Sequence, residues 1–192
     1  MSVADAVKWN GRYQTEGTKW QKSQPRQLLL DYADQLPQTG LALDAAAGVG
    51  IHGLFLAERG WQVIALDISE VGLRLAREAA VAKGLRMETA VFDLSAHPWL
   101  PANTFDLILN FRFLERDTFP LYRKALKPGG WLLFETFVRP AREVADPDYF
   151  LRPGELRAAF SDFKIIHSAQ IETRGSRSGH MKCVEQFVGQ KA

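Results

Sequence analysis

The chain segment 41–69 reads LALDAAAGVGIHGLFLAERGWQVIALDIS, and the rest of the predicted fold is arranged around it. Its first three residues form a short apolar run, which is typical of a strand buried on both faces. Gly48 and Gly50 follow in a predicted turn, where the missing Cβ atoms let the backbone approach a ligand closely. The segment therefore begins as a strand and a tight turn.

The second half of this segment predicts a helix and another strand. Ile51, Leu54 and Phe55 have helical spacing, and Gly60 is placed to end the helix. The apolar run 61–66 predicts a strand that ends on an acid, Asp67. A strand, turn and helix followed by a strand with a terminal acid is how parallel α/β folds hold a nucleoside.

Length and composition limit the protein class. A chain of 192 residues, 46% hydrophobic and 24% charged, fits one domain with a full core. A net charge of +2 does not indicate a nucleic-acid partner. There is no signal-peptide pattern and no apolar run of the roughly 20 residues that span a membrane. We therefore expect a cytoplasmic protein, a monomer or weak homodimer, that binds neither nucleic acid nor membranes. A single cysteine, Cys183, excludes a four-thiolate site, and we expect no metal.

The remaining patterns extend the α/β unit into a larger sheet. Further strands are predicted at residues 87–92, 105–109, 131–138, 163–173 and 182–188. One helix is predicted from its N-cap Ser69 through Lys83 and another through Leu126, and the sequence KPGG at 127–130 predicts a turn. The last two strands have no helix between them, so they must pair antiparallel. We predict one Rossmann-like, doubly wound α/β sheet of seven strands, mostly parallel, with a C-terminal antiparallel β-hairpin. Residues 1–38 form a helical cap or lid, and residues 39–192 form the core of the same single domain.

The glycine turn by itself does not identify the ligand. Gly48, Gly50 and Gly53 match the dinucleotide fingerprint, and Asp67 follows at about the spacing of a ribose-binding acid. An NAD-type ligand therefore has to be considered. However, the chain contains no Tyr-x-x-x-Lys pair, and no histidine has a recognisable acid–base setting for hydride chemistry.

Acidic residues at the strand ends favour a cationic ligand over a diphosphate. Asp44, Asp67 and Asp93 each follow one of the first three predicted strands. A pyrophosphate at the helix N-terminus would meet the charge of Asp44. S-adenosylmethionine fits such a rim, because it carries an ammonium group, a sulfonium, ribose hydroxyls and an adenine amine but no phosphate.

These motifs resemble the class I S-adenosylmethionine-dependent methyltransferases along nearly the whole chain. DAAAGVG, LDIS, FDL and KPGG occur in that family's order, and the terminal antiparallel hairpin is also a family trait. The segments KWNGRY and NFRFLERDTFPLYRKALKPGGWLLFETF are similar to the small-molecule branch, in particular to tellurite-resistance-type and thiopurine-type methyltransferases.

The resemblance implies a set of cofactor-binding residues. Asp44 and the turn backbone would hold the methionine ammonium, Asp67 would accept the ribose hydroxyls, and Asp93 would accept the adenine amine. The implied positions are Asp44, Ala45, Ala46, Gly48, Gly50, Asp67, Ile68, Asp93, Leu94, Asn110 and Phe111. Ala46 departs from the pattern, since many relatives have glycine there, and its methyl group would narrow the turn.

Methyl transfer from a sulfonium requires mainly alignment of nucleophile, methyl and sulfur, so no catalytic triad is expected. Trp9, Arg12, Tyr13 and Trp20 are candidates for a lid over the cofactor, with simple packing of the N-terminal helices on the body as the alternative. Arg112 and Tyr149 are candidates to orient the acceptor, which for Arg112 would be an anion or carboxylate. The alternatives are a salt-bridged loop arginine and plain hydrophobic packing.

The predicted function is transfer of a methyl group from S-adenosylmethionine to a small-molecule acceptor. Two alternatives stay open from the sequence: an NAD(P)-dependent oxidoreductase, and a protein that binds S-adenosylmethionine without turning it over. A nucleic-acid methyltransferase is disfavoured because no dense basic stripe is visible. His52, at the start of a predicted helix, is interpreted as structural or solvated.

Overall fold

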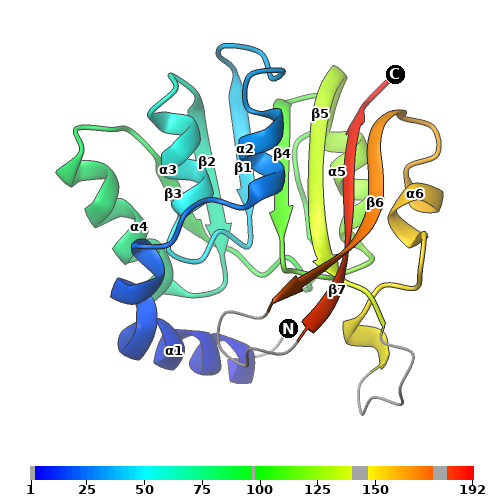
Figure 1. The fold of residues 1–192 in the computed structure, drawn as a ribbon. Helices are drawn as coiled ribbons and strands as arrows, with labels where there is room; N and C mark the ends of the chain where they lie inside the picture. Colours follow the sequence, from blue (N-terminus) through cyan, green and yellow to red (C-terminus); the bar gives the residue numbers. More distant parts are fainter. Residues whose placement is uncertain (1–2, 97, 140–146, 175–180) are drawn as a thin grey trace.

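A seven-stranded sheet forms the centre of the computed structural model, which describes residues 3–96, 98–139, 147–174 and 181–192 (Figure 1). The strand order is β3-β2-β1-β4-β5-β7-β6. The strands are β1 (Leu41–Ala45), β2 (Gln62–Asp67), β3 (Glu88–Val91), β4 (Phe105–Phe111), β5 (Leu126–Phe137), β6 (Lys164–Arg174) and β7 (Met181–Gln190). The first five pair in parallel, and β7 pairs antiparallel with both β5 and β6. The predicted fold class is confirmed.

Helices cover both faces of this sheet. The helices are α1 (Val3–Gln21), α2 (Gln27–Tyr32), α3 (Ile51–Ala57), α4 (Glu70–Ala82), α5 (Thr118–Ala125), α6 (Glu155–Ala159) and the short 3-10 helix η1 (Pro147–Tyr149). Side chains of α2, α3 and α4 share one hydrophobic cluster, and those of α5 and α6 share the other. Helix α1 belongs to neither layer and lies below the carboxyl ends of the parallel strands in Figure 1.

The central strand β4 shows why the apolar runs are continuous. Leu107 and Leu109 pack in the cluster under α2, α3 and α4, whereas Ile108 packs in the opposite cluster, and all three are fully buried. Successive side chains of a strand point to opposite faces, so a strand covered on both faces needs apolar residues at every position. Each such side chain contributes about 1.5–3 kcal/mol through burial.

Two local predictions differ from the structure. Residues 127–130 do not form a turn before the fifth strand but lie inside β5, which begins at Leu126. Gly129 adopts a positive φ of 76°, and its N–H donates to the Lys191 carbonyl over 2.8 Å. The pairing of β4 with β5 shifts register at this point, which leaves room for the positive φ of Gly129. The backbone of Lys191 forms hydrogen bonds with Gly129 and Gly130 in place of a neighbouring strand. The third strand is also shorter than predicted, so Asp93 lies in the loop beyond β3.

Candidate ligand pocket

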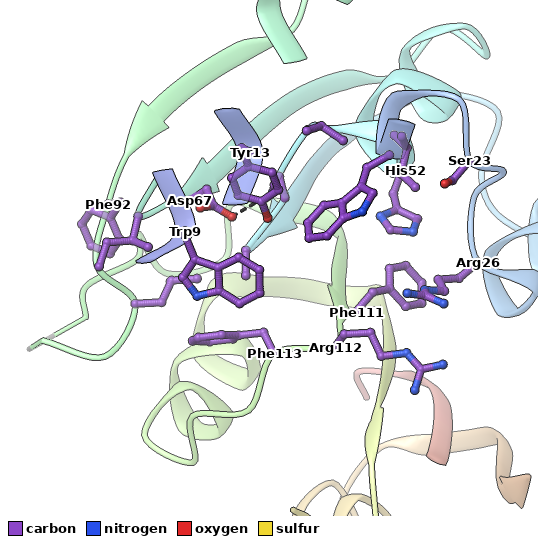
Figure 2. Close-up of a pocket in the computed structure, with 18 of the residues that line it drawn as sticks. Trp9, Tyr13, Ser23, Arg26, His52, Asp67, Phe92, Phe111, Arg112 and Phe113 are labelled. Carbon is purple, nitrogen blue, oxygen red and sulfur yellow. Dashed lines mark hydrogen bonds between the residues drawn. The ribbon is translucent and has the colours of Figure 1, made fainter. Parts of the chain in front are cut away.

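A cavity of about 380 Å³ opens at the carboxyl ends of the parallel strands, between α1 and the turns that follow β1, β2 and β4 (Figure 2). Ligands of open α/β sheets bind at this edge, outside the strand ends. Of the residues predicted for the site, those that line the cavity are Trp9, Tyr13, Ala46, Gly48, Asp67, Ile68, Leu94, Phe111 and Arg112. The sequence therefore located the cavity, although it did not identify its complete lining.

The turn after β1 is built from left-handed backbone. Ala46, Gly48 and Gly50 have φ values of 56°, 58° and 72°. Glycine adopts this region freely, whereas alanine pays roughly 1–2 kcal/mol for it. A Cβ atom at Gly48 would also lie 2.5 Å from the hydroxyl oxygen of Tyr13. A glycine is therefore favoured at position 48 for two reasons: the backbone conformation is left-handed, and Tyr13 of α1 lies too close for a Cβ atom.

Asp67 holds the second turn of the pocket in place. Its Oδ2 accepts the Gly48 N–H over 2.8 Å, and its Oδ1 accepts the Ser69 N–H over 2.8 Å. Burial raises the pKa of Asp67, against the lowering effect of these backbone N–H groups. Each carboxylate oxygen retains a further lone pair, so this side chain still has the capacity to accept hydroxyl donors from a ligand.

Asp44 lies beneath the turn and not in the cavity lining. It is 1% exposed, and its Oδ2 accepts the Gly53 N–H over 2.9 Å. Burial, helped by the charge of Asp67, raises the pKa of Asp44 to about 7. A buried carboxylate with a raised pKa favours a nearby cation, which would stabilise its charged form.

Several other predicted residues also stay outside the lining: Ala45, Gly50, Asp93, Asn110, Arg12 and Tyr149. Asp93 caps its own loop by accepting the Ser95 N–H over 2.8 Å. The amide nitrogen of Asn110 donates to the hydroxyl of Tyr122 over 3.3 Å, on the α5 face of the sheet. Tyr149 is 51% exposed and stacks on Phe137, with ring centroids 6.4 Å apart. Position at a strand end therefore did not ensure that a side chain points into the cavity.

Helix α1 closes the cavity with aromatic side chains. Trp9 stacks on Tyr13 at 5.7 Å, and Trp20 meets Tyr13 edge-on at 5.2 Å. The guanidinium carbon of Arg12 lies over the Trp9 ring, 4.9 Å from the ring centroid. Burial is the main cause that raises the pKa of the Tyr13 hydroxyl, which stays neutral.

Helix α1 is also attached to α4 by hydrogen bonds. The side-chain oxygen of Asn10 accepts from the Ser69 hydroxyl over 2.7 Å and from the Val71 N–H over 3.2 Å. Ser69 in turn accepts the Gly72 N–H over 3.1 Å, which confirms it as the N-cap of α4. Because Ser69 also donates its N–H to Asp67, the lid candidate is connected to the pocket acid through one residue.

The opposite end of the cavity carries Arg26, His52 and Arg112 (Figure 2). Sequence reasoning missed the first two. His52 is only 8% exposed and packs against Phe111, with ring centroids 4.5 Å apart. Its pKa is lowered to about 3 by burial and by the charge of Arg26, so the imidazole is neutral. The position of His52 two residues after Gly50 was the signal that could have placed it in the pocket wall.

Arg112 lies at the cavity wall and also forms an ion pair. It lines the cavity, and its Nη2 pairs with Glu135 Oε1 over 2.9 Å. Its guanidinium also lies 4.5 Å from the centroid of the Phe137 ring. The residue has a positive φ of 65°, which is uncommon for a side chain of this size and is typical of functional positions. Burial lowers the pKa of Arg112 to about 10, so it remains charged at neutral pH.

The described part of the chain shows neither a metal cluster nor a membrane-spanning helix. Within the described ranges, no group of three or more His, Cys, Asp or Glu side chains is arranged to hold a metal ion. Likewise, no described helix has the length and apolar character needed to cross a membrane.

Comparisons with known proteins indicate one family. Residues 42–130 match a protein-family model described as a methyltransferase domain. The chain is 26% identical over 161 residues to a ubiquinone biosynthesis O-methyltransferase of Aliivibrio fischeri, an alignment covering 72% of this chain and 66% of that protein. The crystal structure of TehB from Haemophilus influenzae has a TM-score of 0.79 at 17% identity, covering 92% of this chain and 66% of that one. An S-adenosylmethionine-dependent methyltransferase from Methanosarcina mazei has a TM-score of 0.68 at 20% identity, covering 88% and 99%.

These findings confirm the resemblance to class I S-adenosylmethionine-dependent methyltransferases, and they support S-adenosylmethionine as the cofactor. The structural likenesses, at 17% and 20% identity, establish the shared fold. The chain spans just under two thirds of the length of the O-methyltransferase and of TehB.

Proposed function

We propose that this protein is an S-adenosylmethionine-dependent methyltransferase that acts on a small-molecule acceptor. The observation that carries the proposal is the charge of the cavity around the turn after β1. Asp67 is the charged side chain on that side, and aromatic and aliphatic residues surround it. A cationic sulfonium compound without phosphate suits this wall, whereas a dinucleotide diphosphate would meet Asp67 and Asp44.

The same geometry suggests how the cofactor would lie. Asp67 would accept the ribose hydroxyls, and Ile68, Phe92 and Leu94 would pack on the adenine. The methionine ammonium would lie over the turn at Ala46. The negative charge of buried Asp44 would attract it there, because the protein interior screens the interaction less than water does. The cavity lining lends no support to the cofactor roles that the resemblance implies for Asp93 and Asn110, nor to Arg12 as a lid residue.

The chemistry is an in-line displacement. A lone pair of the acceptor attacks the methyl carbon, the carbon–sulfur bond breaks, and its electron pair stays on sulfur to give S-adenosylhomocysteine. Because the methyl group is already activated, alignment of the two reactants supplies the main catalytic effect, about 7–11 kcal/mol in favourable cases. The protein needs a base only when the acceptor carries a proton at the working pH.

We also propose that residues 1–38 act as a lid on the core formed by residues 39–192. Trp9 and Tyr13 form a wall of the cavity, and both come from α1. Closing such a wall over the reactants excludes water and strengthens the electrostatic interactions inside. A protein lacking residues 1–21 should therefore bind S-adenosylhomocysteine more weakly and lose turnover. Unchanged affinity and turnover would contradict the lid.

Ligand binding provides the direct test of the function. S-adenosylhomocysteine should raise the melting temperature and bind in calorimetry, whereas NAD⁺ and NADP⁺ should not. The variant Asp67→Ala removes the partner of two backbone N–H groups and should lose this binding. Asp162→Ala, at an exposed ion pair with Arg123, is the matched control and should bind normally. Binding of NAD⁺ in place of S-adenosylhomocysteine would overturn the proposal, and lack of donor consumption with every acceptor would favour a non-catalytic binding protein.

A further inference from the structure

Three buried polar atoms at one end of the cavity have no hydrogen-bond partner among the described residues. They are Nε and Nη1 of Arg112 and Nε2 of His52, and both side chains line the cavity. Leaving such groups unpaired costs about 1–3 kcal/mol each, and more for charged groups, so native proteins rarely do so without a reason. His52 and Arg112 lie at the end of the cavity opposite Trp9 and Phe92 (Figure 2).

The charges at this end are also out of balance. Arg26 and Arg112 both line the cavity, and the charge of Arg26 is close enough to lower the pKa of Arg112. A single carboxylate, Glu135, pairs with Arg112, and its other oxygen accepts from Gln186 Nε2 over 2.7 Å. Arg26 has no ion-pair partner within the described ranges. Two guanidinium groups and one carboxylate leave a net positive end, which favours an anion.

The cavity also has aromatic walls. Phe111, which contacts His52, lines it together with Phe113 and Trp20. A simple inorganic oxyanion would leave these aromatic faces without a partner, whereas a compound with an apolar carbon body would bury them. The uncharged imidazole of His52 adds one hydrogen-bonding atom without adding charge.

We propose that the acceptor is a small organic acid with an apolar body. Its carboxylate binds between the guanidinium groups of Arg112 and Arg26, and a polar group of the same molecule bonds to His52 Nε2. This inference rests on the proposed methyltransferase function and specifies its substrate class. The bidentate geometry of a guanidinium suits a carboxylate, and the pair is stronger where water is excluded.

Benzoate is a suitable probe because it combines a carboxylate with an apolar ring. Calorimetric titrations of the full chain would compare benzoate with benzamide, which has the same shape but no charge, and with inorganic phosphate. Each titration is run with and without S-adenosylhomocysteine. Benzoate should bind, and benzamide and phosphate should bind at least about tenfold more weakly, as expected when an ion pair or the apolar contact is lost.

Variants test whether the two arginines hold the anion. Arg26→Gln, at an exposed residue, and Arg112→Lys, which keeps the charge beside Glu135 but loses the fork, should each weaken benzoate binding about tenfold. Both should leave S-adenosylhomocysteine affinity within about twofold of the wild type. Arg74→Gln, at an exposed ion pair on α4, is the control and should change neither. If Arg112→Lys does not fold, Arg26→Gln still decides the result.

The outcomes separate this inference from the proposed function. Binding of S-adenosylhomocysteine with equal affinities for benzoate and benzamide would overturn the organic-acid inference and leave the methyltransferase proposal intact. Preference for phosphate over benzoate would also overturn it, since the apolar walls would then have no role. Benzoate binding that depends on both arginines, without binding of S-adenosylhomocysteine, would support the anion site and refute the cofactor assignment. With both ligands bound, donor consumption by hydroxybenzoates but not by their amides would extend the result to the acceptor.

Discussion

The substitution Gly48→Ala tests how tightly α1 closes over the turn after β1. Gly48 has a φ of 58°, and a Cβ atom there would lie 2.5 Å from the Tyr13 hydroxyl oxygen and 3.1 Å from its ring carbon Cζ. Gly84→Ala is the matched control, because Gly84 also has a positive φ, of 66°, and its Cβ would meet nothing within 4 Å. The two variants therefore share the backbone strain, and only Gly48→Ala adds a steric conflict.

The expected magnitudes follow from these distances. Left-handed backbone costs alanine about 1–2 kcal/mol, so Gly84→Ala should lower the melting temperature by about 2–8 °C in a chain of this size. Overpacking adds about 1–3 kcal/mol, so Gly48→Ala should lose about 2–5 kcal/mol in total unless Tyr13 moves. If Tyr13 moves instead, α1 loosens, and the affinity for S-adenosylhomocysteine should fall.

Urea denaturation and calorimetry would measure both effects. Adding Tyr13→Phe to Gly48→Ala removes the closest atom and should restore part of the lost stability, with a coupling free energy of about 0.5–3 kcal/mol. The reasoning is refuted if Gly48→Ala and Gly84→Ala lose the same stability and both bind S-adenosylhomocysteine as tightly as the wild type.

Three further predictions concern the same pocket. Ala46→Gly should raise the melting temperature by about 2–4 °C, because it relieves the strain of a φ of 56° at alanine. Asn103→Gly, in an exposed turn, is the control and should raise the melting temperature less, since asparagine tolerates a positive φ. An unchanged melting temperature of Ala46→Gly would contradict the strain. The folded state holds the Asp44 proton up to a pKa of about 7, so stability should fall as pH rises from about 4 to that value. The total fall should be about 4 kcal/mol and should be absent in Asp44→Asn, and denaturation curves with the same pH slope in both proteins would refute this. Asn10→Ala removes the bonds to α4 and should weaken S-adenosylhomocysteine binding about tenfold through faster dissociation, whereas exposed Thr15→Ala should not; equal dissociation rates would count against the lid.

Much of the fold was predictable from local patterns. The apolar runs at 41–43 and 61–66 predicted β1 and β2 because both faces of these strands are buried, so the pattern is continuous and easy to recognise. The hairpin of β6 and β7 followed from the lack of a helix between two strand-like runs. The turn predicted at 127–130 failed because glycine signals a positive φ, and a bulged strand satisfies that requirement as well as a turn does.

The site was less predictable, because strand ends converge but their side chains diverge. Asp67 and Ile68 line the cavity as predicted, whereas Asp44 turns its carboxylate to the Gly53 N–H and Asn110 turns to Tyr122 on the far face. Sequence position fixes which strand carries a residue, but one step along a strand changes the face that its side chain reaches.

The sequence by itself determined the order of strands and helices, the edge of the sheet where ligands bind, and an acidic wall suited to a cationic cofactor. These features depend on hydrophobic periodicity, glycine and charge within short segments. Only the tertiary structure decided that Arg26, His52 and Arg112 meet at one end of one cavity. Arg26 precedes α2, His52 lies in α3 and Arg112 follows β4. Contacts across such separations arise from how whole elements pack, which no local pattern encodes.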